Sequence, residues 1–129
     1  MKIKHKLPPN HKAISKVLKP TEYTIYCYGS TLYVPCGLPI PDELMAHEEV
    51  HSRQQEKMGV EKWWDRYLED REFRLKQEIE AYKAQAEYSE ANYDRHERRS
   101  LKKDIIKHLS SDLYGNLITK QEAKKLIYG

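Results

Sequence analysis

Residues 42–58 read DELMAHEEVHSRQQEKM, and this stretch decides how the rest of the chain is interpreted. It follows Pro41 and opens with two acidic residues, which favour the first turn of a helix. Gly59 follows it, where a glycine can cap a helix C-terminus. The pattern predicts one helix over residues 42–58. On that helix His47 and His51 lie one turn apart on the same face, a spacing at which two imidazoles can bind one metal ion.

Glu48 follows the first histidine and lies about 100° from it around the predicted helix. From that position a carboxylate can reach a water molecule beside the ion instead of the ion itself. Two neutral imidazoles, an ion that acidifies water and a carboxylate that takes the proton are what metal-assisted hydrolysis requires. The motif therefore predicts Zn²⁺ as the cofactor and Glu48 as a catalytic residue.

A catalytic zinc ion normally has three protein ligands and one open position. The extended motif that supplies a third histidine six residues after the second fails here, because Lys57 stands at that position. A later helix, expected over residues 73–92, offers Glu78 and Glu80. Glu78 shares the apolar stripe of that helix, whereas Glu80 falls on the solvated side. We therefore predict Glu78 as the third metal ligand, with His108 as a weak reserve.

His47-Glu48-x-x-His51 followed by Glu78-x-x-Ala81 resembles the gluzincin-type metallopeptidases. In those enzymes the glutamate that opens a Glu-x-x-Ala-Asp-like motif is the third zinc ligand, as the resemblance implies for Glu78. The chain departs from the pattern at Tyr82, where many of these families have Asp or Asn.

Residues 46–55, 63–67 and 113–118 are similar to small predicted metallopeptidases encoded by phages and prophages. This resemblance extends over residues 40–128. It implies a minimal zincin fold and a zinc-hydrolase site, and for a phage-encoded protein it implies the host cytoplasm as the location. It does not specify a substrate.

The fold class expected from these patterns is α+β and mostly helical, with a short β-hairpin followed by a zincin-like bundle of three or four helices. One domain should span residues 1–129. Its expected parts are a basic, irregular arm over 1–20, a hairpin over 22–36 that turns at Gly29-Ser30, the helix over 42–58, a chain break near 68–72 and the third-ligand helix over 73–92. In the hairpin register Cys27 faces Leu32 and not Cys36, so both thiols are expected to be free.

The composition and charge of the chain limit which classes of partner we expect. Charged residues make up 33% of the 129 residues and the net charge is only +3. No apolar run approaches the roughly 18 residues of a membrane span, and no signal peptide is apparent, so we expect a cytoplasmic protein without a membrane partner. Arg98-Arg99 and Lys102-Lys103 form basic pairs, but Glu97 and Asp104 dilute them, so nucleic acid is not expected as a partner.

Two aromatic features have more than one interpretation. Tyr114, beside the flexible Gly115, is either a packing residue in a turn or a catalytic donor to the oxyanion of a tetrahedral intermediate. Trp63, Trp64 and Tyr67 at helical spacing are expected in the core.

The sequence thus predicts a zinc metallopeptidase whose substrate is a peptide or protein, held by strand addition to the hairpin strand that leads to the helix over residues 42–58. Two alternatives stay open. One is a zincin-fold binding or virion-structural module without turnover, and the other is a basic nucleic-acid-binding accessory protein. The sequence does not predict the oligomeric state.

Overall fold

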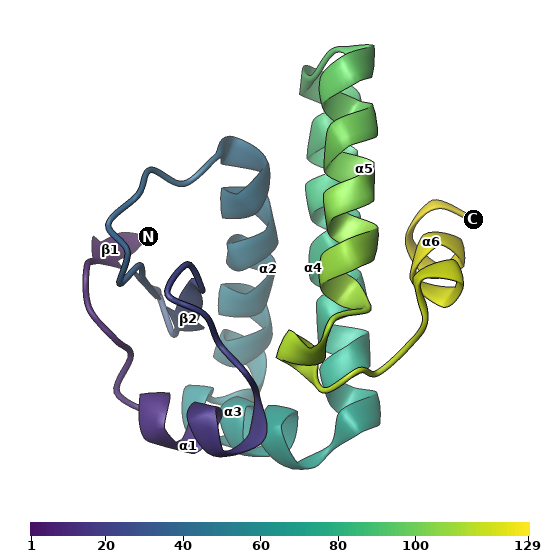
Figure 1. The fold of residues 1–129 in the computed structure, drawn as a ribbon. Coiled ribbons are helices and arrows are strands. Elements are labelled where there is room, and N and C mark those ends of the chain that lie inside the picture. Colours follow the sequence, from purple (N-terminus) through teal and green to yellow (C-terminus); the bar gives the residue numbers. More distant parts are fainter.

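The computed structural model describes all 129 residues as a small sheet followed by a helical bundle (Figure 1), which confirms the expected α+β, mostly helical class. The elements in chain order are β1 (Lys2–Lys4), α1 (His11–Val17), β2 (Tyr26–Tyr28), β3 (Thr31–Tyr33), α2 (Asp42–Met58), α3 (Val60–Glu69), α4 (Arg71–Asn92), α5 (Arg95–Leu109), the 3₁₀ turn η1 (Asp112–Tyr114) and α6 (Lys120–Tyr128). No helix is both long and apolar enough to cross a membrane.

The predicted hairpin forms, but it is shorter than residues 22–36. β2 and β3 pair antiparallel around Gly29-Ser30, and Gly29 has a φ of 65°, which a glycine adopts without strain. Cys27 pairs with Leu32, as the register predicts, and Cys36 lies beyond the strand. Both cysteines are free thiols.

The expectation of an irregular arm over residues 1–20 was wrong. β1 pairs parallel to β3 and completes a sheet with the order β1-β3-β2. After the two prolines the chain forms α1, which buries Ile14, and Leu18 just beyond the helix is also buried. These two apolar residues lie four apart, which places them on one face of a helical turn toward the core.

The helices of the bundle begin and end at recognisable caps. α2 runs over Asp42–Met58 and ends at Gly59, as predicted. The expected break near 68–72 falls at Asp70, whose side chain accepts a hydrogen bond from the backbone N–H of Phe73 and so caps α4. α5 begins with a capping box of Asp94 and Glu97, although the sequence predicted for Glu97 only that it dilutes the basic pairs.

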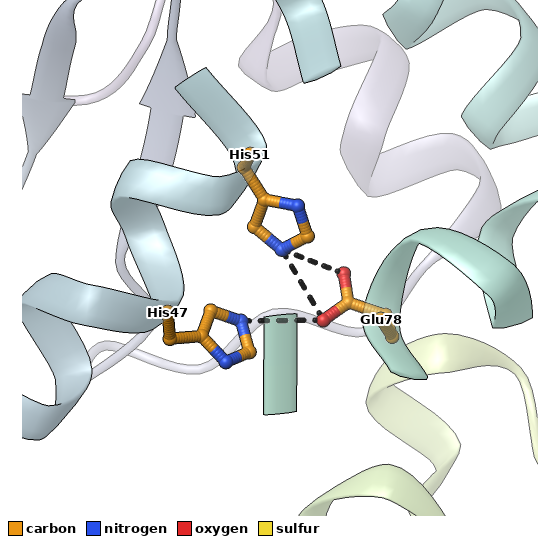
Figure 2. Close-up of side chains that lie close together, drawn as sticks. All are labelled: His47, His51 and Glu78. Carbon is orange, nitrogen blue, oxygen red and sulfur yellow. Dashed lines mark hydrogen bonds and ion pairs between the residues drawn. The ribbon is translucent and has the colours of Figure 1, made fainter. Parts of the chain in front are cut away.

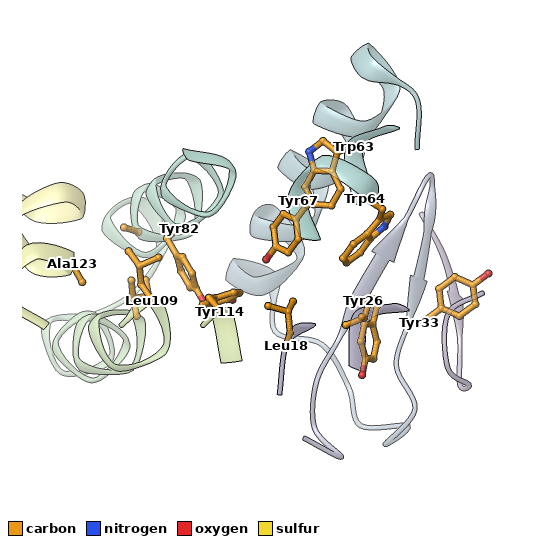
Figure 3. Close-up of a cluster of buried hydrophobic side chains, with 13 residues drawn as sticks. Leu18, Tyr26, Tyr33, Trp63, Trp64, Tyr67, Tyr82, Leu109, Tyr114 and Ala123 are labelled. Atoms are coloured by element: carbon orange, nitrogen blue, oxygen red, sulfur yellow. The ribbon is translucent and has the colours of Figure 1, made fainter. Parts of the chain in front are cut away.

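The core is aromatic, as the tyrosine-rich composition suggests (Figure 3). Trp63, Trp64 and Tyr67 of α3 are buried in it, which confirms the expectation for this triplet. The most extensive helix–helix contact is that of α2 with α4. It brings the helix that carries His47 and His51 against the helix that carries Glu78.

Candidate metal centre

The two histidines of the motif face the interior of the molecule. His47 is 3% exposed and His51 is 5% exposed, whereas Glu49 and Arg53 on the opposite face of α2 are exposed. Apolar and aromatic rings surround the pair. The Tyr82 ring lies 4.4 Å from the His47 ring between centroids. Buried imidazoles need a polar partner, because an unpaired polar group costs free energy in such surroundings.

Glu78 of α4 is that partner. Its Oε1 lies 3.3 Å from Nε2 of His47, and its Oε2 lies 3.1 Å from Nε2 of His51. Figure 2 shows both imidazoles turned toward the one carboxylate. One ligand atom from each residue lies within 4.8 Å of the others, and Glu78 is only 2% exposed. The structure thus brings together the three residues predicted as metal ligands.

The geometry fits a zinc ion. Ligand atoms about 2.0–2.2 Å from a tetrahedral zinc lie about 3.4 Å from one another. One carboxylate oxygen, Oε1 of Glu78, lies 3.3 Å from Nε2 of His47 and 3.3 Å from Nε2 of His51, which is close to that value. Two histidines and one carboxylate are also a ligand set of known catalytic zinc sites, which leave one position open.

Two glutamines, which the sequence analysis did not single out as site residues, fix the orientation of the histidines. Nδ1 of His47 lies 3.0 Å from Oε1 of Gln85, and Nδ1 of His51 lies 2.8 Å from Oε1 of Gln54. Gln54 donates its own Nε2 to the backbone oxygen of Gln77 at 3.2 Å, which fixes its oxygen toward His51. An amide oxygen only accepts, so each Nδ1 carries a proton, and in the neutral form of each imidazole Nε2 is the nitrogen left to bind a metal ion.

Tyr67 holds the carboxylate from the other side. Its hydroxyl donates to Oε2 of Glu78 at 2.6 Å. Burial alone would raise the pKa of Glu78, but the charges and hydrogen bonds of His51 and His47 outweigh burial and hold this pKa well below its usual range. Glu78 is therefore ionised, the form in which a carboxylate binds a metal.

The same pocket favours a positive charge. Burial lowers the pKa of His51, but the charge and hydrogen bond of Glu78, with a further contribution from Glu48, outweigh burial and raise it to about 9. A proton on His51 and a metal ion beside it are two ways to supply that charge. They compete, because a metal binds only the neutral imidazole.

Glu48 lies in the same pocket but outside the ligand group. It is 6% exposed. Burial raises its pKa, and so does the charge of Glu78, while His47 and His51 lower it; the net result is a raised pKa. A carboxylate with a raised pKa is a stronger base than one in water, which suits proton transfer near neutral pH.

The pocket around these groups is narrow and largely apolar. Its volume is about 60 Å³, room for a few water molecules. The chain before the motif forms much of the wall, and the segment that follows α5 closes another part. From these two parts the lining takes Ile14, Leu18, Pro20, Thr24, Ile25, Tyr26, Cys27, Leu113 and Tyr114.

Tyr114 lies in this wall, so the structure places the proposed oxyanion donor beside the site. Its hydroxyl forms a 2.7 Å hydrogen bond with the hydroxyl of Tyr82, and the residue is 9% exposed. Tyr82 thus pairs with another tyrosine at the position where the motif that this segment resembles often has Asp or Asn. The packing interpretation of Tyr114 describes this arrangement, and its catalytic role stays a prediction.

The other candidate ligands lie elsewhere. Glu80 is exposed, as expected from its side of the helix. His108 is exposed too and does not join the ligand group. His96 is exposed on α5.

The hairpin strand that leads to α2 does not offer the edge expected for strand addition, because β3 is paired with β1 on one side and with β2 on the other. The backbone oxygen of Cys27 in β2 already accepts hydrogen bonds from Nε2 of Gln55 at 2.9 Å and from Nε1 of Trp64 at 3.1 Å. An added strand would have to displace both side chains. A peptide added at the outer edge of the hairpin, along β2, therefore lacks this carbonyl as an acceptor.

Comparison of the chain with known protein families, with curated proteins and with solved structures finds no match.

Proposed function

We propose that the protein is a zinc-dependent hydrolase that cleaves peptide bonds, with His47, His51 and Glu78 as zinc ligands and Glu48 as general base. One observation carries the proposal. Nitrogens from α2 and a carboxylate from α4 converge at zinc-like spacing, with a second, unbound carboxylate in the same buried pocket.

A zinc ion in this site would supply Lewis acidity for the scissile carbonyl. The chain supplies the proton transfer and the positioning. Glu48 takes a proton from water in the pocket and returns it to the leaving amine, and its raised pKa favours both steps. Gln54 and Gln85 hold the imidazoles in place. The apolar wall excludes bulk water and strengthens the electrostatic interactions inside.

The lining favours a peptide over a phosphate-bearing substrate, because no lysine or arginine lines the pocket. Its volume of about 60 Å³ accepts a small apolar group and not a whole peptide. A longer substrate therefore requires part of the pocket wall to move outward.

The test is Glu48→Gln in zinc-loaded protein, assayed on a fluorogenic peptide library. Zinc content and fold should be unchanged, because Glu48 does not belong to the ligand group. Hydrolysis should fall about a hundredfold to ten-thousandfold, because the amide cannot accept a proton. Glu49→Gln is the matched control, since Glu49 is exposed on the far side of the same helix, and it should retain full activity.

Two results would contradict the proposal. Activity that survives Glu48→Gln undiminished would remove Glu48 from the mechanism. Zinc-loaded wild-type protein that cleaves no member of the library would favour the alternative of a zincin-fold binding module without turnover.

A further inference from the structure

A second hollow lies between α4, α5 and α6. It is separate from the metal centre, because α2 and α6 lie on opposite sides of the α4–α5 pair (Figure 1). Its volume is about 310 Å³. We call it the α5 groove and define it by its lining: Ala86, Ser89, Glu90, Arg95, Arg98, Arg99, Lys102 and Tyr128.

Four cations line the groove from one face of α5. Arg95, Arg98, Arg99 and Lys102 follow the spacing i, i+3, i+4 and i+7, so the last three lie within about 60° of the first around the helix. The stripe is about 10 Å long, from a rise of about 1.5 Å per residue. A row of cations of this length can contact more than one phosphate of an extended anion.

The acids that led us not to expect nucleic acid do not neutralise this stripe. Glu97 and Asp104 lie about 160–180° from Arg95 around α5. Glu97 is also engaged in the capping box, where its side chain accepts from the backbone N–H of Asp94 at 3.1 Å. Acidic residues thus interrupt the basic residues along the sequence, but they do not lie on the face of α5 that lines the groove.

The cations have few partners of their own. Glu90 is the single acid in the lining, and it lies 3.9 Å from Nε of Arg98, with both side chains partly or largely exposed. Arg95, Arg99 and Lys102 have no carboxylate within 4.0 Å. Lys102 instead places its ammonium 4.9 Å from the centre of the Tyr128 ring. Clustered, unpaired cations attract an anion more strongly than cations interleaved with acids.

We propose that the α5 groove binds the phosphodiester backbone of single-stranded nucleic acid. The stripe contacts successive phosphates, and the Tyr128 ring offers a surface on which a base stacks. A hollow between three helices admits a single strand, whereas a duplex is too wide to enter it. Ala86 and Tyr128 are the two apolar residues of the lining, so no large aliphatic side chain is available to enter a lipid layer.

The test measures binding of a labelled single-stranded oligonucleotide by fluorescence anisotropy over a salt series. Arg95→Glu with Arg99→Glu removes two exposed cations from the groove. Lys76→Glu with Lys107→Glu is the matched control, because these exposed lysines lie outside the groove and the charge change is equal. The groove variant should bind at least tenfold more weakly, and its salt slope should fall by about 1.4, from about 0.7 per phosphate contact. The control should stay close to wild type.

The same series with chelator-treated protein separates this proposal from the proposed hydrolase. Binding should be unchanged without metal, because the groove does not share a residue with the metal centre. The proposal is overturned by absence of binding at low salt, by equal weakening in both double variants, or by a loss of binding with chelator. Equal affinity for a duplex would also contradict it, and so would binding to anionic vesicles in place of the oligonucleotide.

Discussion

The metal centre and the α5 groove both take polar side chains from α4 and from a helix packed against it, but the two regions differ in what surrounds those side chains. Glu78 is 2% exposed and has three partners, whereas Arg95 and Arg99 are exposed and have no carboxylate within 4.0 Å. A buried polar group is costly unless it is paired, while an exposed one is solvated by water. Substitutions in the metal centre should therefore destabilise the fold. Substitutions in the groove should leave stability nearly unchanged and affect only ligand binding.

The largest effect is expected from His51→Ala. This change removes one of the two nitrogen ligands and should largely empty the site of zinc, which elemental analysis of the purified protein measures. His96→Ala is the matched control, because His96 is exposed on α5. Protein that holds no transition metal after purification without chelator, and binds none on reconstitution, would contradict the metal centre itself.

Glu78→Gln should weaken zinc binding more than about a hundredfold, because the amide lacks the negative charge of this direct ligand. A loss of about a hundredfold is the upper limit usually seen when a residue that only hydrogen-bonds a metal ligand is replaced. Glu80→Gln should leave the zinc affinity unchanged, since Glu80 is exposed. A competition titration against a chromophoric chelator measures both. A crystal structure with Glu80 or His108 on the metal would refute the assignment of Glu78.

Gln54→Leu should lower the zinc affinity about tenfold to a hundredfold, the usual result of removing the acceptor behind a metal-binding imidazole. The leucine leaves the Nδ1 proton of His51 without its acceptor, and the ring loses its fixed orientation. Gln121→Leu on exposed α6 is the control. An unchanged affinity in Gln54→Leu would mean that the hydrogen bond does not position His51.

The smallest effects concern stability. Gln55 is fully buried, accepts from the backbone N–H of Gly29 at 2.6 Å and donates to the Cys27 oxygen. Gln55→Leu should lower the free energy of unfolding by about 1–3 kcal/mol, because it leaves the backbone N–H of Gly29 without its acceptor and the Cys27 oxygen with Trp64 as its one remaining side-chain donor. Arg99→Ser in the groove should change it by less than about 0.5 kcal/mol. Urea unfolding measures both, and similar losses would contradict the contrast between buried and exposed polar groups.

Periodicity and caps predicted most of the helical part. The bounds of α2 follow from Pro41 and Gly59, and the inward face of His47 and His51 follows from the 3.6-residue repeat. The choice of Glu78 over Glu80 rested on the same repeat, and the structure places Glu78 between the two imidazoles. These features are local, so a single sequence contains them.

The missed features depend on contacts between distant segments. Gln85 reaches His47 only because α4 packs against α2, and no spacing along the chain indicates that contact. Gln54 could have been found, since it lies three residues after His51 on the same helix face. The N-terminal arm was misjudged because its prolines and lysines obscured Ile14 and Leu18, which the aromatic core buries.

The two side chains that donate hydrogen bonds to the Cys27 carbonyl, Gln55 and Trp64, also influence self-association of the protein. A sheet edge with free backbone groups can pair with another copy of the chain and start aggregation. Gln55 and Trp64 occupy this carbonyl on the β2 edge. The other edge is β1, only three residues long, where Lys2 and Lys4 flank Ile3 and all three are exposed. A short edge with two lysines resists pairing with a neighbour through charge repulsion, so the two edges are protected by different means.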